Sequence, residues 1–222
     1  MKKEGCKMSK DRINSFLYEK KGEYLDQVKE IAMADTEILN EILQGLKSKN
    51  EIFRYNCYKV IFQISKTHSQ LLYPKWDYFF DLLESPNAYH RMSAINIISY
   101  LTSADTGKKF DLVFDRYFQF LDDGSMIVAR YLALSAGIIA KNKPYLAEKI
   151  MEKLLEIENT HHEEGRKDLI KHDIIQSFSV LFEQIVEKEK TLSFVEKQLN
   201  SSSPKTRKAA KAFLNKFRKS NL

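Results

Sequence analysis

The local pattern that decides the fold is clearest in residues 123–134, DGSMIVARYLAL. A turn-forming start is followed by an apolar helix that carries an arginine near its beginning, and residues 85–95, SPNAYHRMSAI, repeat the arrangement. A basic residue stands at the same place in five such segments, at intervals of 37, 39, 41 and 36 residues: Arg54, Arg91, Arg130, Lys171 and Arg207. A period of this length predicts helix pairs that stack into an α-solenoid, because one pair cannot bury its apolar face alone.

Apolar residues on either side of the basic position define the predicted core. In four segments a leucine closes the preceding helix eight or nine residues earlier: Leu46, Leu83, Leu121 and Leu199. After the basic residue, apolar side chains recur at offsets of 3, 4, 7 and 10, which trace one face of an α-helix. These columns hold Cys57, Tyr58, Ile61 and Ile64; Ala94, Ile95, Ile98 and Leu101; Ala133, Leu134, Gly137 and Ala140; Ile174, Ile175, Phe178 and Leu181; and Ala210, Leu214 and Phe217. Lys211 interrupts the last set, as suits a terminal unit that meets water.

Residues 11–34 carry a weaker apolar pattern around Gly22, which predicts one or two helices. We expect these to cap the front of the array within residues 1–35. Residues 36–222 are expected to form one continuous domain of about five helix pairs, since a stacked array grows by adding units.

The pattern resembles that of HEAT repeats, most clearly in the two quoted segments, over about residues 36–219. The resemblance implies an all-α superhelix in which the second helix of each pair lines the concave wall. It also implies an acidic turn residue that pairs with the basic residue, but only Asp123 is acidic here. Asn50, Asn87 and Ser203 occupy the other turns, where each can cap the second helix by accepting a backbone N–H bond.

The basic character of the chain is concentrated at one end. The formal net charge is +6, and residues 205–222 contain seven basic residues and no acidic one, so the preceding residues sum to −1. A positive groove along the whole protein, as expected of a nucleic-acid binder, is therefore not supported. We expect residues 205–219 to form a capping helix whose lysines face water. The alternative is attachment to an anionic lipid, RNA or an acidic partner.

Composition sets the remaining limits. Apolar residues make up 43% and charged residues 30%, as in ordinary folded helical domains. No apolar run approaches the roughly 20 residues needed to cross a bilayer, and the polar start is unlike a secretory signal, so we expect a cytoplasmic protein. Cys6 and Cys57 are too few for a disulfide framework or a four-thiolate metal site. Cys57 is expected to be buried and inert.

The second helices also predict a surface for a partner. One residue after the basic position stand Tyr55, Met92, Tyr131, His172 and Lys208, and five after it stand Lys59, Asn96, Ser135, Gln176 and Ala212. Tyrosine and arginine supply large contact area at modest ordering cost, which favours a protein-binding strip on the concave face. Its candidate residues are Arg54, Tyr55, Lys59, Arg91, Asn96, Arg130, Tyr131, Ser135, His172 and Gln176. The alternative is a solvated face whose arginines only tie adjacent units together.

The fourth segment carries about eight additional residues, 159–167, and such insertions often have a function. They include the run His161, His162, Glu163 and Glu164, with His172 following. A zincin-type metal site needs two histidines four residues apart on one helix, but Arg166 stands where the second would follow His162. We therefore expect a polar loop and no metal.

Trp76, with Asp77 and Asp81 nearby, raises one enzymatic alternative. DNA-alkylation-repair glycosylases are of similar size and built from HEAT-like units, but their catalytic pattern has no match here and Trp76 is expected on an outer first helix. Glycine-rich phosphate loops and nucleophile elbows are also absent from the sequence. We expect a non-catalytic scaffold without a cofactor, with a protein partner favoured and nucleic acid as the alternative; the oligomeric state is left open.

Overall fold

The computed structural model describes residues 9–218, and every regular element in that range is a helix. The described chain divides into two compact units, the first ending at Lys75 and the second beginning at Trp76. The sequence places the end of the capping helices at residue 35, whereas in the structure these helices share the first unit with the elements that follow them. Cys6 and Lys219 lie outside the described residues.

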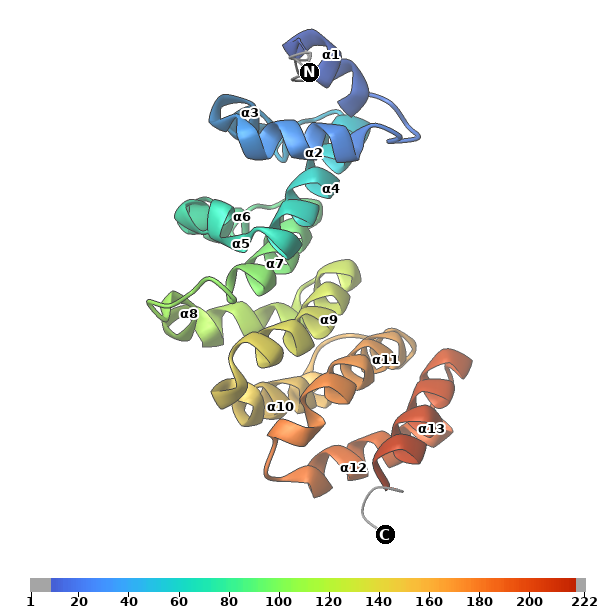
Figure 1. Ribbon diagram of the computed structural model, residues 1–222. Helices are drawn as coiled ribbons and strands as arrows, with labels where there is room; N and C mark the ends of the chain where they lie inside the picture. Colours follow the sequence, from blue (N-terminus) through green and yellow to red (C-terminus); the bar gives the residue numbers. More distant parts are fainter. Residues whose placement is uncertain (1–8, 219–222) are drawn as a thin grey trace. The chain divides into compact units, whose positions relative to one another are not determined.

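The first unit is built around a long helix, α4. Its elements are α1 (Lys10–Leu17), α2 (Leu25–Ala34), α3 (Thr36–Gly45), α4 (Glu51–Thr67), α5 (Ser69–Leu72) and the short 3₁₀ turn η1 (Tyr73–Lys75) (Figure 1). The sequence predicts one or two helices around Gly22, and the structure has two, α1 and α2. Gly22 has φ +63°, a left-handed conformation that glycine adopts without a Cβ clash. Both α2 and α3 pack against α4. The buried Asn56 of α4 donates from Nδ2 to the carbonyl oxygens of Leu17 (2.9 Å) and Glu19 (2.8 Å), which ties the end of α1 to α4.

The second unit alternates short first helices with longer second helices. The elements are α6 (Trp76–Leu82), α7 (Ala88–Leu101), α8 (Lys109–Phe118), η2 (Gln119–Asp122), α9 (Met126–Asn142), η3 (Pro144–Leu146), α10 (Ala147–Leu155), η4 (Glu156–Asn159), α11 (Glu164–Leu181), η5 (Phe182–Gln184), α12 (Lys188–Lys197), η6 (Gln198–Asn200) and α13 (Pro204–Arg218). Helices α7, α9, α11 and α13 pack in succession, each against the next, as Figure 1 shows. Within this unit every second helix therefore contacts a neighbouring second helix.

The buried columns follow the predicted helical period. All positions at offsets of 3, 7 and 10 are buried, from Cys57 in α4 to Phe217 in α13. The prediction is wrong at Leu134, which is 40% exposed, because α7 and α11 cover α9 from two sides and leave Leu134 on the remaining open stripe. Leu199, expected to close the core side of its helix, is also exposed, at 42%, in the 3₁₀ turn η6.

The second helices begin at polar caps, as predicted. Oδ1 of Asn50 accepts a bond from the backbone N–H of Phe53 (3.0 Å), and Oδ1 of Asn87 accepts one from Tyr89 (2.9 Å). In α13 the hydroxyl of Ser203 accepts from Thr206 N–H at 3.3 Å. These bonds satisfy donors that the first turn of a helix otherwise leaves without partners.

The recurring arginine makes the same bond in three separate segments. Nη1 of Arg54, Arg91 and Arg207 donates to the carbonyl oxygen six residues earlier, at 2.8, 2.8 and 2.7 Å. The acceptors belong to Ser48, Ser85 and Ser201, each in the turn before the helix. The bond therefore fixes each turn to the helix that follows, which gives a physical reason for the arginine at this place in the local pattern.

The fourth segment makes an equivalent bond with a different residue. Lys167 donates from Nζ to the carbonyl oxygen of Glu158 (3.1 Å), and α11 begins three residues before Lys167, as α4, α7 and α13 begin three residues before their arginines. Lys171 instead pairs with the Glu158 side chain at 2.9 Å. Part of the expected 159–167 insertion is thus one additional helical turn, and the loop itself is short.

Candidate functional site

Two neighbouring second helices expose large side chains on adjoining stripes. We call this surface the α9–α11 face and define it by Tyr131, Leu134, Ile138, Gln176 and Val180. Tyr131, Leu134 and Ile138 are spaced three and four residues apart on α9, so they lie on one side of that helix. Leu134 is 40% and Val180 48% exposed, although the rest of both helices is mostly buried. Large apolar side chains thus occupy a surface where a purely solvated helix would carry charge.

The predicted strip is narrower than expected because two of its members are buried. Asn96 and Ser135, expected to be exposed, are 6% and 1% exposed. In α7 every residue from Met92 to Ser99 is buried, and within its unit α6 and α9 both pack against this helix. The exposure prediction is wrong at these positions, and the open surface lies on α9 and α11.

Arg130 and His172 meet at a carboxylate between the two helices of the face. Nε of Arg130 donates to Oδ2 of Asp173 (2.6 Å), and Nδ1 of His172 lies 2.9 Å from Oδ1 of the same residue. The Asp173 side chain is 2% exposed. Its bond to Arg130 raises the pKa of the guanidinium above the usual value, and burial opposes this effect. The pair joins α9 to α11 beneath the exposed residues.

Arg91 ties its helix to the next turn. Its Nε and Nη2 donate to the two carboxylate oxygens of Asp123 at 2.7 and 2.8 Å, a bidentate geometry that fixes both direction and distance. Asp123 therefore forms the pair that the HEAT resemblance implies. Arg91 and Arg130 both bridge neighbouring segments, so their guanidinium groups contribute to packing between helices.

The remaining candidate residues lie in the first unit. Tyr55 of α4 is 54% exposed, and the ammonium of Lys59 lies 4.4 Å from the centre of its ring. This distance is typical of a cation–π contact. Arg54 precedes them and is held by its bond to the turn.

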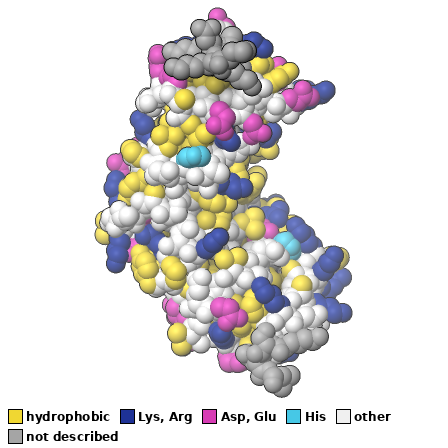
Figure 2. Space-filling model, in the orientation of Figure 1, with side chains coloured by type: hydrophobic (Ala, Val, Ile, Leu, Met, Phe, Trp, Pro, Cys, Tyr) yellow, Lys and Arg dark blue, Asp and Glu magenta, His cyan; other side chains and the backbone are white. Residues whose placement is uncertain are grey.

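Helix α13 presents a basic surface. It buries the stripe Ala209, Ala210, Phe213, Leu214 and Phe217, as the sequence predicts, and exposes Lys205, Arg207, Lys208 and Lys211. Its sequence contains no acidic residue. Figure 2 shows basic side chains gathered along the edge of the second unit where Figure 1 places α13.

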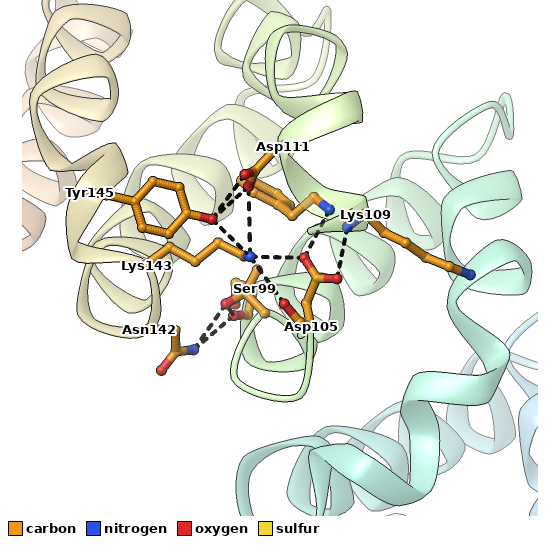
Figure 3. A network of polar contacts seen from close by, with 9 residues as sticks. Ser99, Asp105, Lys109, Asp111, Asn142, Lys143 and Tyr145 are labelled. Atoms are coloured by element: carbon orange, nitrogen blue, oxygen red, sulfur yellow. Dashed lines mark hydrogen bonds and ion pairs between the residues drawn. The ribbon is translucent and has the colours of Figure 1, made fainter. Parts of the chain in front are cut away.

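A buried ion pair holds the loop before α8. The ammonium of Lys143 lies 2.9 Å from Oδ2 of Asp105, and both side chains are almost completely buried (Figure 3). Asp105 also accepts backbone bonds from Lys109 and Phe110 at the start of α8, and Tyr145 donates to Asp111 nearby. Burial acts to lower the pKa of Lys143, but the bonds to Asp105 and Tyr145 outweigh it and raise that pKa. These polar groups bond to one another, so the network stabilises the loop before α8.

The structure brings a carboxylate to the histidine loop. Asp122, at the end of η2, lies beside His161 and His162, and one donor atom from each of the three side chains lies within 4.8 Å of the others. The sequence alone does not single out Asp122 as a candidate ligand. The 39 residues that separate it from His161 leave no local signal of the contact.

Trp76 and Cys57 are both core residues. Trp76 is 3% exposed and packs edge-on against Phe110, with ring centres 6.5 Å apart, so it does not line an open wall. Cys57 is buried as predicted, and burial raises the pKa of its thiol to about 12. Neither side chain is placed to meet a ligand from solvent.

Comparison with known proteins adds no relative. No protein-family model matches the chain, and no curated protein matches it. Across residues 9–218, none of the helices combines the length and the apolar character that a bilayer crossing requires.

Proposed function

We propose that the protein is a non-catalytic scaffold, a stacked array of HEAT-like helix pairs that binds a protein partner through the α9–α11 face. The repeated turn bonds of Arg54, Arg91 and Arg207 support the array, because one interaction recurs at one position of the repeat. Repeat arrays present extended surfaces formed by equivalent helices. We thus propose that the fold is a solenoid and that the protein acts by recognising a partner.

The observation that carries the binding proposal is the exposure of Leu134 and Val180 on adjoining helices. Tyr131 flanks them on α9, and the ion pair between the partly exposed Arg130 and the buried Asp173 joins the two helices. Binding energy at protein interfaces concentrates on a few large side chains in the centre of a patch, surrounded by polar groups. The basic helix α13 packs against α11, so a partner with apolar and acidic side chains fits best.

The experiment compares capture of partners from a lysate of the source cells by two matched double variants. Leu134→Ala with Val180→Ala truncates the face, whereas Leu112→Ala with Val186→Ala truncates side chains that are each 87% exposed elsewhere. We expect the affinity of the first variant for the partner to be at least about tenfold weaker, which corresponds to about 1.4 kcal/mol. The affinity of the second variant should be unchanged. Equal capture by both variants contradicts the proposal.

The basic surface of α13 favours nucleic-acid binding as a second candidate. Nuclease treatment of the lysate separates the two, because a protein partner survives it. Direct binding to duplex DNA would weaken with salt, with a slope of about −0.9 per phosphate contact in a double-logarithmic plot. Nuclease-sensitive capture with a steep salt slope would replace the protein-partner proposal.

A further inference from the structure

Three side chains with metal-binding chemistry meet where the loop before α11 crosses the turn before α9. Asp122 ends η2, and His161 and His162 occupy the loop between η4 and α11. The sequence predicts no metal here, because the histidines lack the zincin spacing. Asp122 supplies the missing third ligand from a different segment.

The cluster is held in place by backbone as well as side-chain bonds. The backbone N–H of His161 donates to Oδ1 of Asp122 (2.8 Å), and Nδ1 of the same histidine lies 2.5 Å from that oxygen. His162 is 5% exposed, and its Nε2 lies 3.1 Å from the carbonyl oxygen of Leu121. A carbonyl only accepts, so Nε2 of His162 carries the proton of this bond. Bonds of this kind orient the histidines of metal sites.

The ligand set and the distances suit a transition-metal ion. Zinc binds histidine nitrogen at about 2.0–2.1 Å and carboxylate oxygen at about 2.0–2.2 Å, usually with four ligands. The three donor atoms already lie within 4.8 Å of one another, so small side-chain rotations bring them around one ion. Two imidazoles with one carboxylate are characteristic of divalent d-block cations, whereas Mg²⁺ and Ca²⁺ prefer oxygen ligands.

The site has room for further ligands. Asp122 also lines a cavity of about 400 Å³, together with Glu156, Asn159 and Thr160. Water or a small ligand can complete the coordination from that side. We propose that Asp122, His161 and His162 bind a divalent d-block cation, Zn²⁺ foremost, which ties the loop before α11 to the turn before α9 and keeps an open position toward this cavity.

Protons compete with the metal for the same groups. Partial burial acts to raise the pKa of the Asp122 carboxyl, but the backbone and ring bonds from His161 outweigh it and lower that pKa. Metal binding requires neutral imidazoles and a carboxylate, so the affinity is expected to fall as the pH is lowered.

The test is calorimetric titration of the chelator-treated full chain with Zn²⁺, in a Cys6→Ser background that removes a competing thiol. Asp122→Asn and His161→Asn change ligands whose side chains are half exposed, so they leave the core intact. His68→Asn is the matched control, since His68 is exposed at the end of α4. We expect one ion per chain, an affinity at least about tenfold weaker in both ligand variants, and no change in the control.

A second readout follows the first turn of α11, which comes directly after the loop. Arg166 is exposed just after the cluster, and Zn²⁺ is expected to slow tryptic cleavage there in the parent and in His68→Asn but not in Asp122→Asn. Co²⁺ is expected to give visible d–d absorption that Zn²⁺ abolishes. Absence of saturable Zn²⁺ binding, or binding that persists unchanged in both ligand variants, overturns the proposal.

Discussion

Lys143 and Asp105 illustrate how single residues hold the second unit together. The ammonium of Lys143 also lies 3.3 Å from the Asp105 carbonyl oxygen. One lysine therefore bonds to both the side chain and the backbone of Asp105. Asp105 in turn satisfies two N–H groups at the start of α8. An isolated buried charge is costly, and this arrangement leaves neither charge without a partner.

Replacing Lys143 should therefore destabilise the protein strongly. Lys143→Met leaves the fully buried Asp105 carboxylate without its countercharge and is expected to lower the free energy of unfolding by about 3–5 kcal/mol. Lys149→Met is the control, because its pair with Asp115 is exposed and should contribute less than about 1 kcal/mol. Urea denaturation measures both. Similar losses in the two variants would show that the buried pair has no special role.

Asp168 predicts an acid-dependent contribution to stability. Its Oδ2 accepts bonds from the backbone N–H (2.9 Å) and hydroxyl (2.5 Å) of Ser202. Burial acts to raise the pKa of the Asp168 carboxyl, but the bonds from Ser202 and Ser201 and the charge of Lys171 lower it on balance. A carboxyl with a depressed folded-state pKa stabilises the fold above its unfolded value, about 3.9, and loses this contribution as the pH falls through the folded value.

The difference in unfolding free energy between the parent chain and Asp168→Asn should accordingly be largest near neutral pH. It should narrow below about pH 4 as the parent carboxyl is protonated. Urea denaturation at several pH values tests this, with the exposed Asp81→Asn as control. A difference that stays constant from pH 7 to about pH 3 would rule out the assigned role of Asp168.

At the scale of helices, the contact between α9 and α11 depends on a position without a side chain, Gly137. The backbone N–H of Gly137 donates to the hydroxyl of Ser177 at 2.9 Å, and the same hydroxyl donates to the carbonyl oxygen of Ala133. A Cβ at Gly137 would lie 3.1 Å from both Cα and Oγ of Ser177. The close approach of the two backbones therefore requires glycine.

Two helical glycines should respond in opposite directions to alanine. Gly137→Ala is expected to cost about 1–3 kcal/mol, because overpacking outweighs the better helix propensity of alanine. Gly165→Ala, in the first turn of α11, meets nothing within 4 Å and should be neutral or stabilise by up to about 1 kcal/mol. Thermal and urea unfolding of both variants provide the comparison. Stabilisation by Gly137→Ala would contradict the close packing of α9 on α11.

The same two helices show what periodicity predicts and what it leaves out. A period of 3.6 residues places Ile174, Ile175 and Phe178 in the core, since one buried face is enough to locate them. It predicts the exposure of Leu134 and Ser135 wrongly because α9 has neighbours on two sides. The sequence of one helix does not indicate how many neighbours pack against it. The contact of Asp122 with His161 joins residues 39 apart, so only the packed structure reveals it.

At the scale of the whole molecule, the proposed architecture predicts that stability is local. In a repeat array each helix pair contacts only the pairs next to it. The free energy of unfolding is therefore roughly a sum of contributions from single pairs and from the interfaces between them. The successive packing of α7, α9, α11 and α13 gives the second unit this character. Damage at one end should then leave distant helices of the same unit protected.

Native-state hydrogen exchange of Phe213→Ala tests this claim most directly. Phe213 of α13 is 2% exposed and packs on Phe182 with ring centres 5.2 Å apart, so its loss should cost about 3–5 kcal/mol. We expect the amides of α12 and α13 to exchange much faster, while those of α7, in the same unit, keep the rates of the parent chain. Acceleration of α7 by the same factor as α13 would reveal one cooperative globule and contradict the array of stacked helix pairs.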